Sequence, residues 1–447
     1  MHSSARTAAL LLMTLVVALL LRPWDHWEAL AAVRPVLLLL TAIAVVWLAD
    51  APKLRLLADP PTKPLILLCF VAAATAPLSV WPSRSAEVAF NILQQAALLA
   101  MLAHLVTTPA MVERLATLMA ACGTIHGSIA TVTYLRQELT PDGRVFGTGH
   151  GVFADPNDLA LSLVMIFPFA WWRFVESKSL GARLVAVGSL AVMLAGILAS
   201  QSRGGLLAWG AAVVVLGVKA RSGIASLAGV VAAASLAAAL LFPSDVFDRY
   251  SSIVHYQSDE SATTRLAIWK AGASMFADHL LTGVGAGGFE VAYGQEYLDR
   301  KGAGNVWRAA HSSYIQIAAE LGIFGLAAWL AFIAAILATL RRAGRLLAAS
   351  TDEAAAPSLA AWVDAAPASI VGFLVGAAFL SRGYDFLIVI IAGTASAVLR
   401  QATAFSSRVA PSRETQPIAQ ALAEAPVSAN QAYVGDLLRD SPAPAAE

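Results

Sequence analysis

Long apolar segments recur along almost the whole chain, and short polar stretches separate them. A transmembrane helix needs about 20 mostly apolar residues, and about twelve segments approach that length. The expected spans are residues 7–21, 35–49, 64–80, 86–107, 115–135, 156–175, 182–200, 204–219, 222–242, 313–340, 367–381 and 384–400. We therefore predict an all-α polytopic membrane protein, whose transmembrane domain covers residues 1–400.

The composition supports this class. Of the 447 residues, 58% are hydrophobic and 13% are charged, a proportion that leaves a soluble domain too few polar residues for its surface. The net charge of +1 predicts no binding to nucleic acid. Cys69 and Cys122 both lie within apolar runs, so we expect neither a zinc site nor a disulfide.

The distribution of lysine and arginine orients the spans, because basic residues concentrate in cytoplasmic loops. With a cytoplasmic N-terminus, the short loops carry twelve basic residues inside and seven outside. Both termini are then cytoplasmic, and the long loop 243–312 is periplasmic. The first apolar run could be a cleaved signal peptide, but its removal would reverse this parity. Residues 401–447, rich in Ala, Pro, Ser and Gln, are expected to form a disordered tail.

An arginine is retained in the outside hairpin Ser200-Gln201-Ser202-Arg203-Gly204-Gly205, where the positive-inside rule disfavours it. This hairpin joins two apolar spans, so the guanidinium lies near the lipid headgroups. A planar, permanently charged fork suits a phosphate or diphosphate. The alternative is an interfacial arginine with no ligand.

The long loop has an organisation of its own. Ser258-Asp259-Glu260-Ser261 predicts a helix that starts near Ala262. Its apolar residues recur at steps of three and four, which suits a helix lying on the bilayer surface: Leu266, Trp269, Ala273, Phe276 and Leu280. Arg265 and Trp269 project from one side of this helix. Arg265 could meet a lipid diphosphate, or it could be a solvated charge.

A glycine-rich run follows, Gly283-Val284-Gly285-Ala286-Gly287-Gly288. No strand precedes it and no Gly-Lys-Ser/Thr follows it, so neither nucleotide-binding motif applies. A tight turn without a ligand is the expectation. Elsewhere, Asp155 before Pro156 is expected to cap a helix, and the polar residues Asn91, Gln94 and Gln95 should face the bundle interior rather than lipid.

A histidine ends the loop at Ala310-His311-Ser312-Ser313-Tyr314, where the tenth apolar run begins. Its ordinary pKa near 6.5 would let His311 accept a proton at neutral pH, although a lone histidine can also be structural. Tyr314 shares its side of the helix. Glu320 is nine residues later, on the opposite side and roughly 13 Å along the axis, so we do not pair it with His311.

Several of these motifs together resemble the bacterial O-antigen ligase family. His311-Ser312, followed after nine residues by Gly322-Ile323-Phe324-Gly325, looks like the family's histidine motif. Ser202-Arg203-Gly204-Gly205 is similar to its arginine-bearing segment. Thr264-Arg265 with Trp269 is similar to its periplasmic loop, and Gly151-Val152-Phe153 with Asp155-Pro156-Asn157 resembles its mid-chain segment. The resemblance covers about residues 145–335.

The resemblance implies a metal-independent membrane glycosyltransferase of GT-C-like architecture, without a cofactor, in the bacterial inner membrane. Its donor would be a glycan on undecaprenyl diphosphate, and its acceptor a lipid or glycan such as lipid A–core. Arg203 and Arg265 would hold the diphosphate, and His311 would orient or deprotonate the acceptor hydroxyl. Arg84, Arg144 and Tyr314 are secondary candidates near this site.

Other functions remain open from the sequence. A polymerase of O-antigen or exopolysaccharide, an enzyme of a teichoic acid system and a protein O-oligosaccharyltransferase share the architecture and differ in the acceptor. A lipid-glycan flippase would need charged residues deep within the spans. The spans are nearly free of charge, with His104 and His126 as intramembrane exceptions. A non-enzymatic scaffold would not depend on His311.

Overall fold

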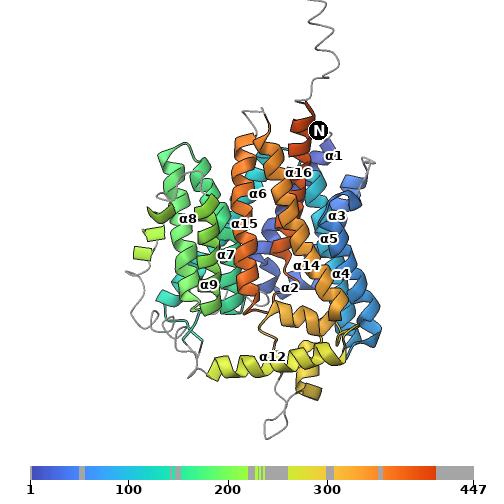
Figure 1. Cartoon of the computed structure of the whole chain (residues 1–447). Coiled ribbons are helices and arrows are strands. Elements are labelled where there is room, and N and C mark those ends of the chain that lie inside the picture. The colour runs from blue at the N-terminus through green and yellow to red at the C-terminus, as the bar shows by residue number, and fades with distance from the viewer. Residues whose placement is uncertain are drawn as a thin grey trace, which may run out of the picture.

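A computed structural model describes the architecture of the chain (Figure 1). It describes residues 3–49, 56–140, 143–145, 153–219, 227–229, 231–232, 235–236, 260–297, 307–350 and 356–408. Within these residues the molecule is a helical bundle with one helix lying across its end.

The long helices of the bundle are α1 (Ser3–Leu21), α3 (Pro35–Leu48), α4 (Thr62–Thr75), α5 (Pro82–Leu105), α6 (Pro109–Leu135), α7 (Pro156–Glu176), α8 (Leu180–Ala199), α9 (Arg203–Lys219), α14 (Ser313–Ala348), α15 (Ala356–Ala377) and α16 (Phe386–Arg408). Among the described residues, eight helices are long and apolar enough to cross a membrane, and two shorter apolar helices accompany them. The predicted polytopic all-α class is therefore confirmed. Each predicted span coincides with one of these helices except 222–242, most of which lies outside the described residues.

The remaining elements lie at the ends of the bundle. Two short helices, η1 (Pro23–Asp25) and α2 (Glu28–Ala32), connect α1 to α3, and η2 (Leu56–Ala58) and η3 (Ala76–Leu78) flank α4. The long loop contributes α12 (Glu260–Asp278), α13 (Phe289–Ala292) and η5 (Tyr293–Tyr297).

Helix α12 lies across one end of the bundle, roughly perpendicular to the long helices, whereas the start of α1 and the end of α16 lie at the opposite end (Figure 1). The expected helix near Ala262 is thus confirmed, together with the placement of both terminal helix ends on one face. We call the end that carries α12 the α12 face.

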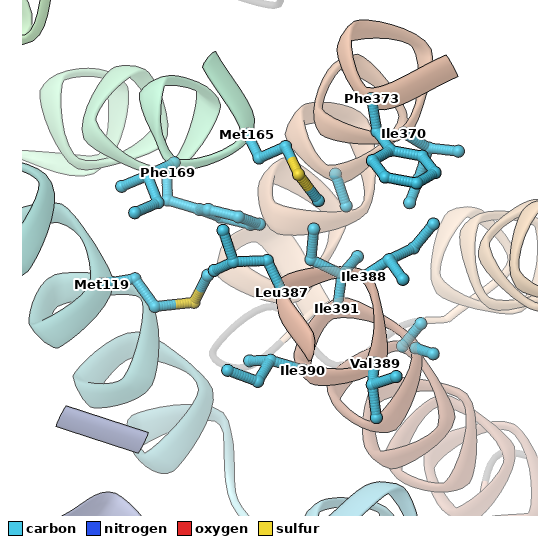
Figure 2. Packing of buried hydrophobic residues seen from close by; sticks show 14 of the residues in the cluster. Met119, Met165, Phe169, Ile370, Phe373, Leu387, Ile388, Val389, Ile390 and Ile391 are labelled. Carbon is cyan, nitrogen blue, oxygen red and sulfur yellow. The ribbon is translucent and has the colours of Figure 1, made fainter. Parts of the chain in front are cut away.

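The centre of the bundle is a continuous apolar core formed by α6, α7, α15 and α16 (Figure 2). Five consecutive residues of α16, Leu387 to Ile391, are at most 2% exposed. A helix that is apolar on every side is buried on every side, as expected for a central membrane span. This helix anchors the loop before it, residues 378–385, against the bundle.

A sharp kink divides α14 at Gly322, whose φ of 62° and ψ of −161° are not helical. The segment before the kink packs beside α12, and the segment after it runs the length of the bundle (Figure 1). The glycine-rich turn 283–288 packs on the kink: Val284 N donates to Ala319 O and Gly285 N to Glu320 O, both at 2.9 Å. The predicted tight turn is therefore confirmed, with positive φ at Gly283, Gly285 and Gly287.

The face of α12 that packs on the protein differs from the stripe that the sequence suggested. Ile268, Ala271 and Met275 are the buried residues, whereas Leu266 is 58% and Leu280 47% exposed. Leu266, Ala273 and Leu280 of the predicted stripe are therefore exposed, whereas Trp269 and Phe276 are partly buried.

The tail begins later than predicted. Residues 401–408, expected to be disordered, continue α16 as far as Arg408, and residues 409–447 lie outside the described residues. Polar contacts hold this last part of the helix. Arg400 bonds both carboxylate oxygens of Asp59 at 2.8 and 2.9 Å and lies 2.9 Å from His104 Nε2, while Gln401 donates to Val106 O at 3.0 Å.

Candidate functional site

His311 lies on the α12 face, directly before α14, in a segment without regular structure. Its φ of 47° is left-handed, a conformation uncommon for a residue other than glycine and enriched at functional sites. The indole Nε1 of Trp269 donates to the Ala310 carbonyl at 3.0 Å and fixes the preceding peptide to α12. Ser313 Oγ, two residues later, donates to Leu380 O at 2.7 Å. The backbone on both sides of the partly buried imidazole is thus held in place.

The surroundings of His311 keep its imidazole neutral. Burial is the largest cause of a lowered pKa for this histidine, and the positive charges of Arg265 and Arg308 lower the pKa further. Asp155 acts in the opposite direction. A neutral imidazole has a free nitrogen lone pair, so His311 can accept a proton at pH 7.

The amino end of α7 connects Asp155 to the hairpin that carries Arg203. The Asp155 carboxylate accepts the backbone N–H of Asn157 at 2.7 Å, which confirms its predicted role as a helix cap. Asn157 Oδ1 in turn accepts the hydroxyl of Ser202 at 2.8 Å and Nη2 of Arg144 at 2.7 Å. Arg203 is the first residue of α9 and follows Ser202 directly.

The structure thus brings most of the predicted site residues to one face. His311 and Arg265 are close enough to interact electrostatically, and Asp155 links them to the network of Arg144 and the Arg203 hairpin. Arg144 also donates from Nε to Ser200 O at 3.0 Å, so its guanidinium braces the hairpin. Gly151 and Val152 of the mid-chain motif lie outside the described residues.

Two secondary candidates lie elsewhere. Tyr314 points into the bundle, where its hydroxyl donates to Leu374 O at 3.0 Å and its ring meets Trp329 edge-on. Arg84 lies at the start of α5 and pairs with Glu87 at 2.9 Å. Its guanidinium borders the two cavities described below rather than the Arg203 hairpin.

A buried ion cluster was not predicted. Arg382, in the loop between α15 and α16, contacts the carboxylates of Asp385 and of Asp158, the latter at 3.7 Å. Burial lowers the pKa of Arg382, but the carboxylates of Asp385 and Asp158 outweigh this effect and raise the pKa above its ordinary value, so the side chain stays charged. In the sequence, Asp158, Arg382 and Asp385 lie near the ends of strongly apolar spans. Each resembles an ordinary charge that flanks a span, so their pairing could not be predicted.

Two cavities open beside these residues. One, of about 450 Å³, extends from Ala309 and Ala310 to Glu320 and the start of α5. The other, of about 620 Å³, lies between α1, α3, α5 and the loop 381–386. Asn91, Gln94 and Gln95 line the second cavity, which confirms that they face the bundle interior.

Glu320 is 1% exposed, yet its carboxylate is held by several donors. Gly287 N donates to Oε2 at 2.9 Å, and the Tyr384 hydroxyl donates to the same oxygen at 2.7 Å. The carboxylate thereby ties α14 to the glycine-rich turn and to the loop before α16. Burial of a charged side chain is not visible in a sequence, so this role could not be predicted.

Among the described residues no group of three or more His, Cys, Asp or Glu side chains could hold a metal ion. The metal-independent reaction stays a prediction. Chemically, the α12 face combines a neutral base with fixed guanidiniums, an arrangement suited to activating a hydroxyl beside an anionic group.

Comparison with known proteins agrees with this geometry. Residues 188–330 match the family model described as O-antigen ligase. The match begins in α8 and includes the Arg203 hairpin, α12, His311 and the kink of α14. No curated protein matches the sequence. Over residues 188–330, about a third of the chain, the sequence is therefore similar to the O-antigen ligase family.

Proposed function

We propose that this protein transfers a glycan from undecaprenyl diphosphate to lipid A–core, as an O-antigen ligase, at the periplasmic face of the bacterial inner membrane. The observation that carries the proposal is the environment of His311, a neutral imidazole fixed beside Arg265 at one end of the bundle. The α12 face would be periplasmic, and both ends of the chain cytoplasmic, in agreement with the distribution of basic residues.

The reaction needs a base and an anion site. His311 accepts the proton of an acceptor hydroxyl, and the acceptor oxygen then bonds to the anomeric carbon of the donor sugar. The bond from that carbon to the diphosphate oxygen breaks, and undecaprenyl diphosphate leaves with the electron pair. Arg203 and Arg265 offset the charge that develops on the diphosphate, because guanidiniums fixed before the reaction stabilise it without reorganising.

The test is a gel profile of surface glycolipids and carrier-linked glycan in a deletion strain complemented with wild type or with His311→Ala. For a ligase, the variant should leave unmodified core and long glycan on its lipid carrier. A general base contributes about 10²–10⁴-fold, so transfer should fall by that order. Arg203→Lys should retain part of the activity, since lysine keeps the charge but not the bidentate fork.

The same gel separates related functions. Core capped by a single repeat in the variant strain would identify a polymerase, and loss of glycan from a protein would identify an oligosaccharyltransferase. An unchanged profile, with membrane levels of His311→Ala equal to wild type, would refute the catalytic role of His311 and favour a flippase or a scaffold.

A further inference from the structure

The polar face of α5 has no structural explanation within the bundle. Gln95 donates to the Tyr384 carbonyl at 2.9 Å, but the side-chain amides of Asn91 and Gln94 have no hydrogen-bond partner among the described residues. Asn91 lies about 13 Å along α5 from Pro82. Asn91 is exposed to the cavity that it lines together with Gln94, so both amides can hydrogen-bond to water or to a polar ligand there.

The two cavities share lining residues and form one cleft, which extends to the segment just before His311. Arg84, Glu87, Gln316 and Ser381 line both of them, and Ala309 and Ala310 line the smaller one. Each volume falls within the roughly 300–1,000 Å³ of small-molecule sites. The Ser381 hydroxyl, at the junction, also lacks a hydrogen-bond partner among the described residues. A ligand in this cleft would therefore reach from α5 to Ala310, the residue before His311.

Carboxylates outnumber guanidiniums in and around the cleft. Its lining contains three arginines (Arg22, Arg84 and Arg382) and four carboxylates (Glu87, Asp158, Glu290 and Glu320). Each arginine is paired with a carboxylate: Arg22 with Asp25, Arg84 with Glu87, and Arg382 with Asp385 and Asp158. A diphosphate would gain little there, because every guanidinium already has an anionic partner.

The remaining chemistry suits a carbohydrate. Carboxamides both donate and accept, so they match vicinal hydroxyl groups, and the aromatic rings of Trp24, Trp81 and Trp307 can cover the apolar face of a sugar ring. We propose that this cleft binds the sugar portion of a substrate, with Asn91 and Gln94 as specificity-determining residues. The proposal rests on the proposed glycan transfer and assigns its sugar subsite.

The experiment measures binding to the full chain in nanodiscs, with His311→Ala to prevent turnover. Three probes are used: glycan released from the cell's own carrier by mild acid, lipid A–core from a strain without carrier-linked glycan, and bare undecaprenyl diphosphate. Asn91→Leu and Gln94→Leu remove the amides at nearly constant volume. Phe90→Leu, on the exposed side of α5, is the matched control.

Each amide variant should weaken one sugar-bearing probe by roughly 3- to 10-fold, the range expected for the loss of neutral hydrogen bonds. Binding of bare undecaprenyl diphosphate should stay unchanged, which also shows that the variant is folded. Weakened binding of released glycan assigns the cleft to the donor, and weakened binding of lipid A–core assigns it to the acceptor.

The proposal is overturned if neither sugar-bearing probe binds to the His311→Ala protein, if the amide variants bind both like Phe90→Leu, or if they weaken the bare carrier equally. Failure of the proposed function looks different. A wild-type protein that binds glycan in the cleft but transfers none would refute the transferase and leave the subsite intact.

Discussion

The imidazole of His311 experiences opposing charges from three side chains. Arg265 and Arg308 disfavour its protonation and Asp155 favours it, while burial adds to the effect of the arginines. The result is a base that stays neutral below the pH at which an exposed histidine becomes protonated. A donor diphosphate beside Arg265 would oppose this effect, so binding of the donor would make the base stronger.

The pH dependence of transfer tests this arrangement. Because the pKa of His311 is lowered from 6.5, activity in the wild type should be lost only when pH falls below that value. Arg265→Gln removes a positive charge, so the pKa should rise and the acid limb should move to higher pH. Asp155→Asn should move it to lower pH. The measurement is the midpoint of the pH–rate profile, which does not depend on the maximal rate.

Movement of both midpoints in the same direction would contradict the electrostatic account. Lys270→Gln is the control. It removes one positive charge from the same helix, but Lys270 is not among the charges that shift the pKa of His311. Its profile should coincide with that of the wild type.

At the scale of elements, the kinked start of α14 is held by backbone contacts. Gly322 is left-handed, and Ile323 N donates to Leu280 O at 2.8 Å. Gly283 packs so closely on the kink that an added Cβ would lie 2.2 Å from the Glu320 carbonyl oxygen. The segment that carries His311 therefore has its orientation fixed by the loop between α12 and α13.

Gly283→Ala should disturb this contact. The substitution forces backbone to move against backbone and places alanine at a φ of 65°, so we expect a loss of about 1–3 kcal/mol in stability. Gly188→Ala, where nothing lies within 4 Å of the added Cβ, should be neutral or slightly stabilising. Thermal unfolding in detergent measures both. Equal unfolding temperatures for the two variants would show that the kink does not depend on this approach.

Apolar periodicity was sufficient to predict the helices, because a membrane span must pair all its backbone N–H and C=O groups within the segment and carry mostly apolar side chains. The cap at Asp155, the turn at 283–288 and the inward face of α5 were also predictable from local chemistry. The later start of the tail was not, since Asp59, which holds Arg400, is remote in sequence. Arg203, Arg265 and His311 were proposed from motifs, and their roles stay predictions. The buried contacts of Glu320 and Arg382 were not anticipated, because their partners come from distant segments.

At the scale of the molecule, the Arg382 cluster connects elements that are far apart in sequence. It joins α7 to the loop before α16, and Asp385 Oδ1 also accepts the backbone N–H of Leu387. Arg382 and Asp385 are nearly inaccessible, with side-chain exposures of 6% and 0%. Removal of Arg382 alone leaves the fully buried carboxylate of Asp385 unpaired, whereas removal of both leaves only the partly exposed Asp158 without its partner.

Arg382→Leu should therefore destabilise the bundle by about 3–5 kcal/mol, and the double variant Arg382→Leu with Asp385→Leu should recover part of that loss. Chemical unfolding monitored by tryptophan fluorescence gives both values. A double variant that is less stable than the single variant would contradict the account. Arg84→Leu, whose ion pair with Glu87 is exposed, serves as the control and should cost little.

The orientation of the bundle has a direct test. Ala277→Cys on α12 and Ala349→Cys at the end of α14 lie at exposed positions on opposite faces. In intact cells, a membrane-impermeant maleimide that reaches the periplasm should label the first and not the second. Labelling of Ala349→Cys alone would invert the topology and place His311 in the cytoplasm.

The pairing of every arginine in the cleft has a consequence for ionic strength. Added salt screens attraction between a fixed charge and an incoming one, and the Debye length falls from about 10 Å at 0.1 M to 3 Å at 1 M. A cleft whose guanidiniums are all paired should hold a neutral sugar equally well across that range, whereas a diphosphate attracted by Arg203 and Arg265 should bind more weakly as salt is added. The salt dependence of binding would thus distinguish binding of the sugar from binding of the carrier diphosphate without any mutation.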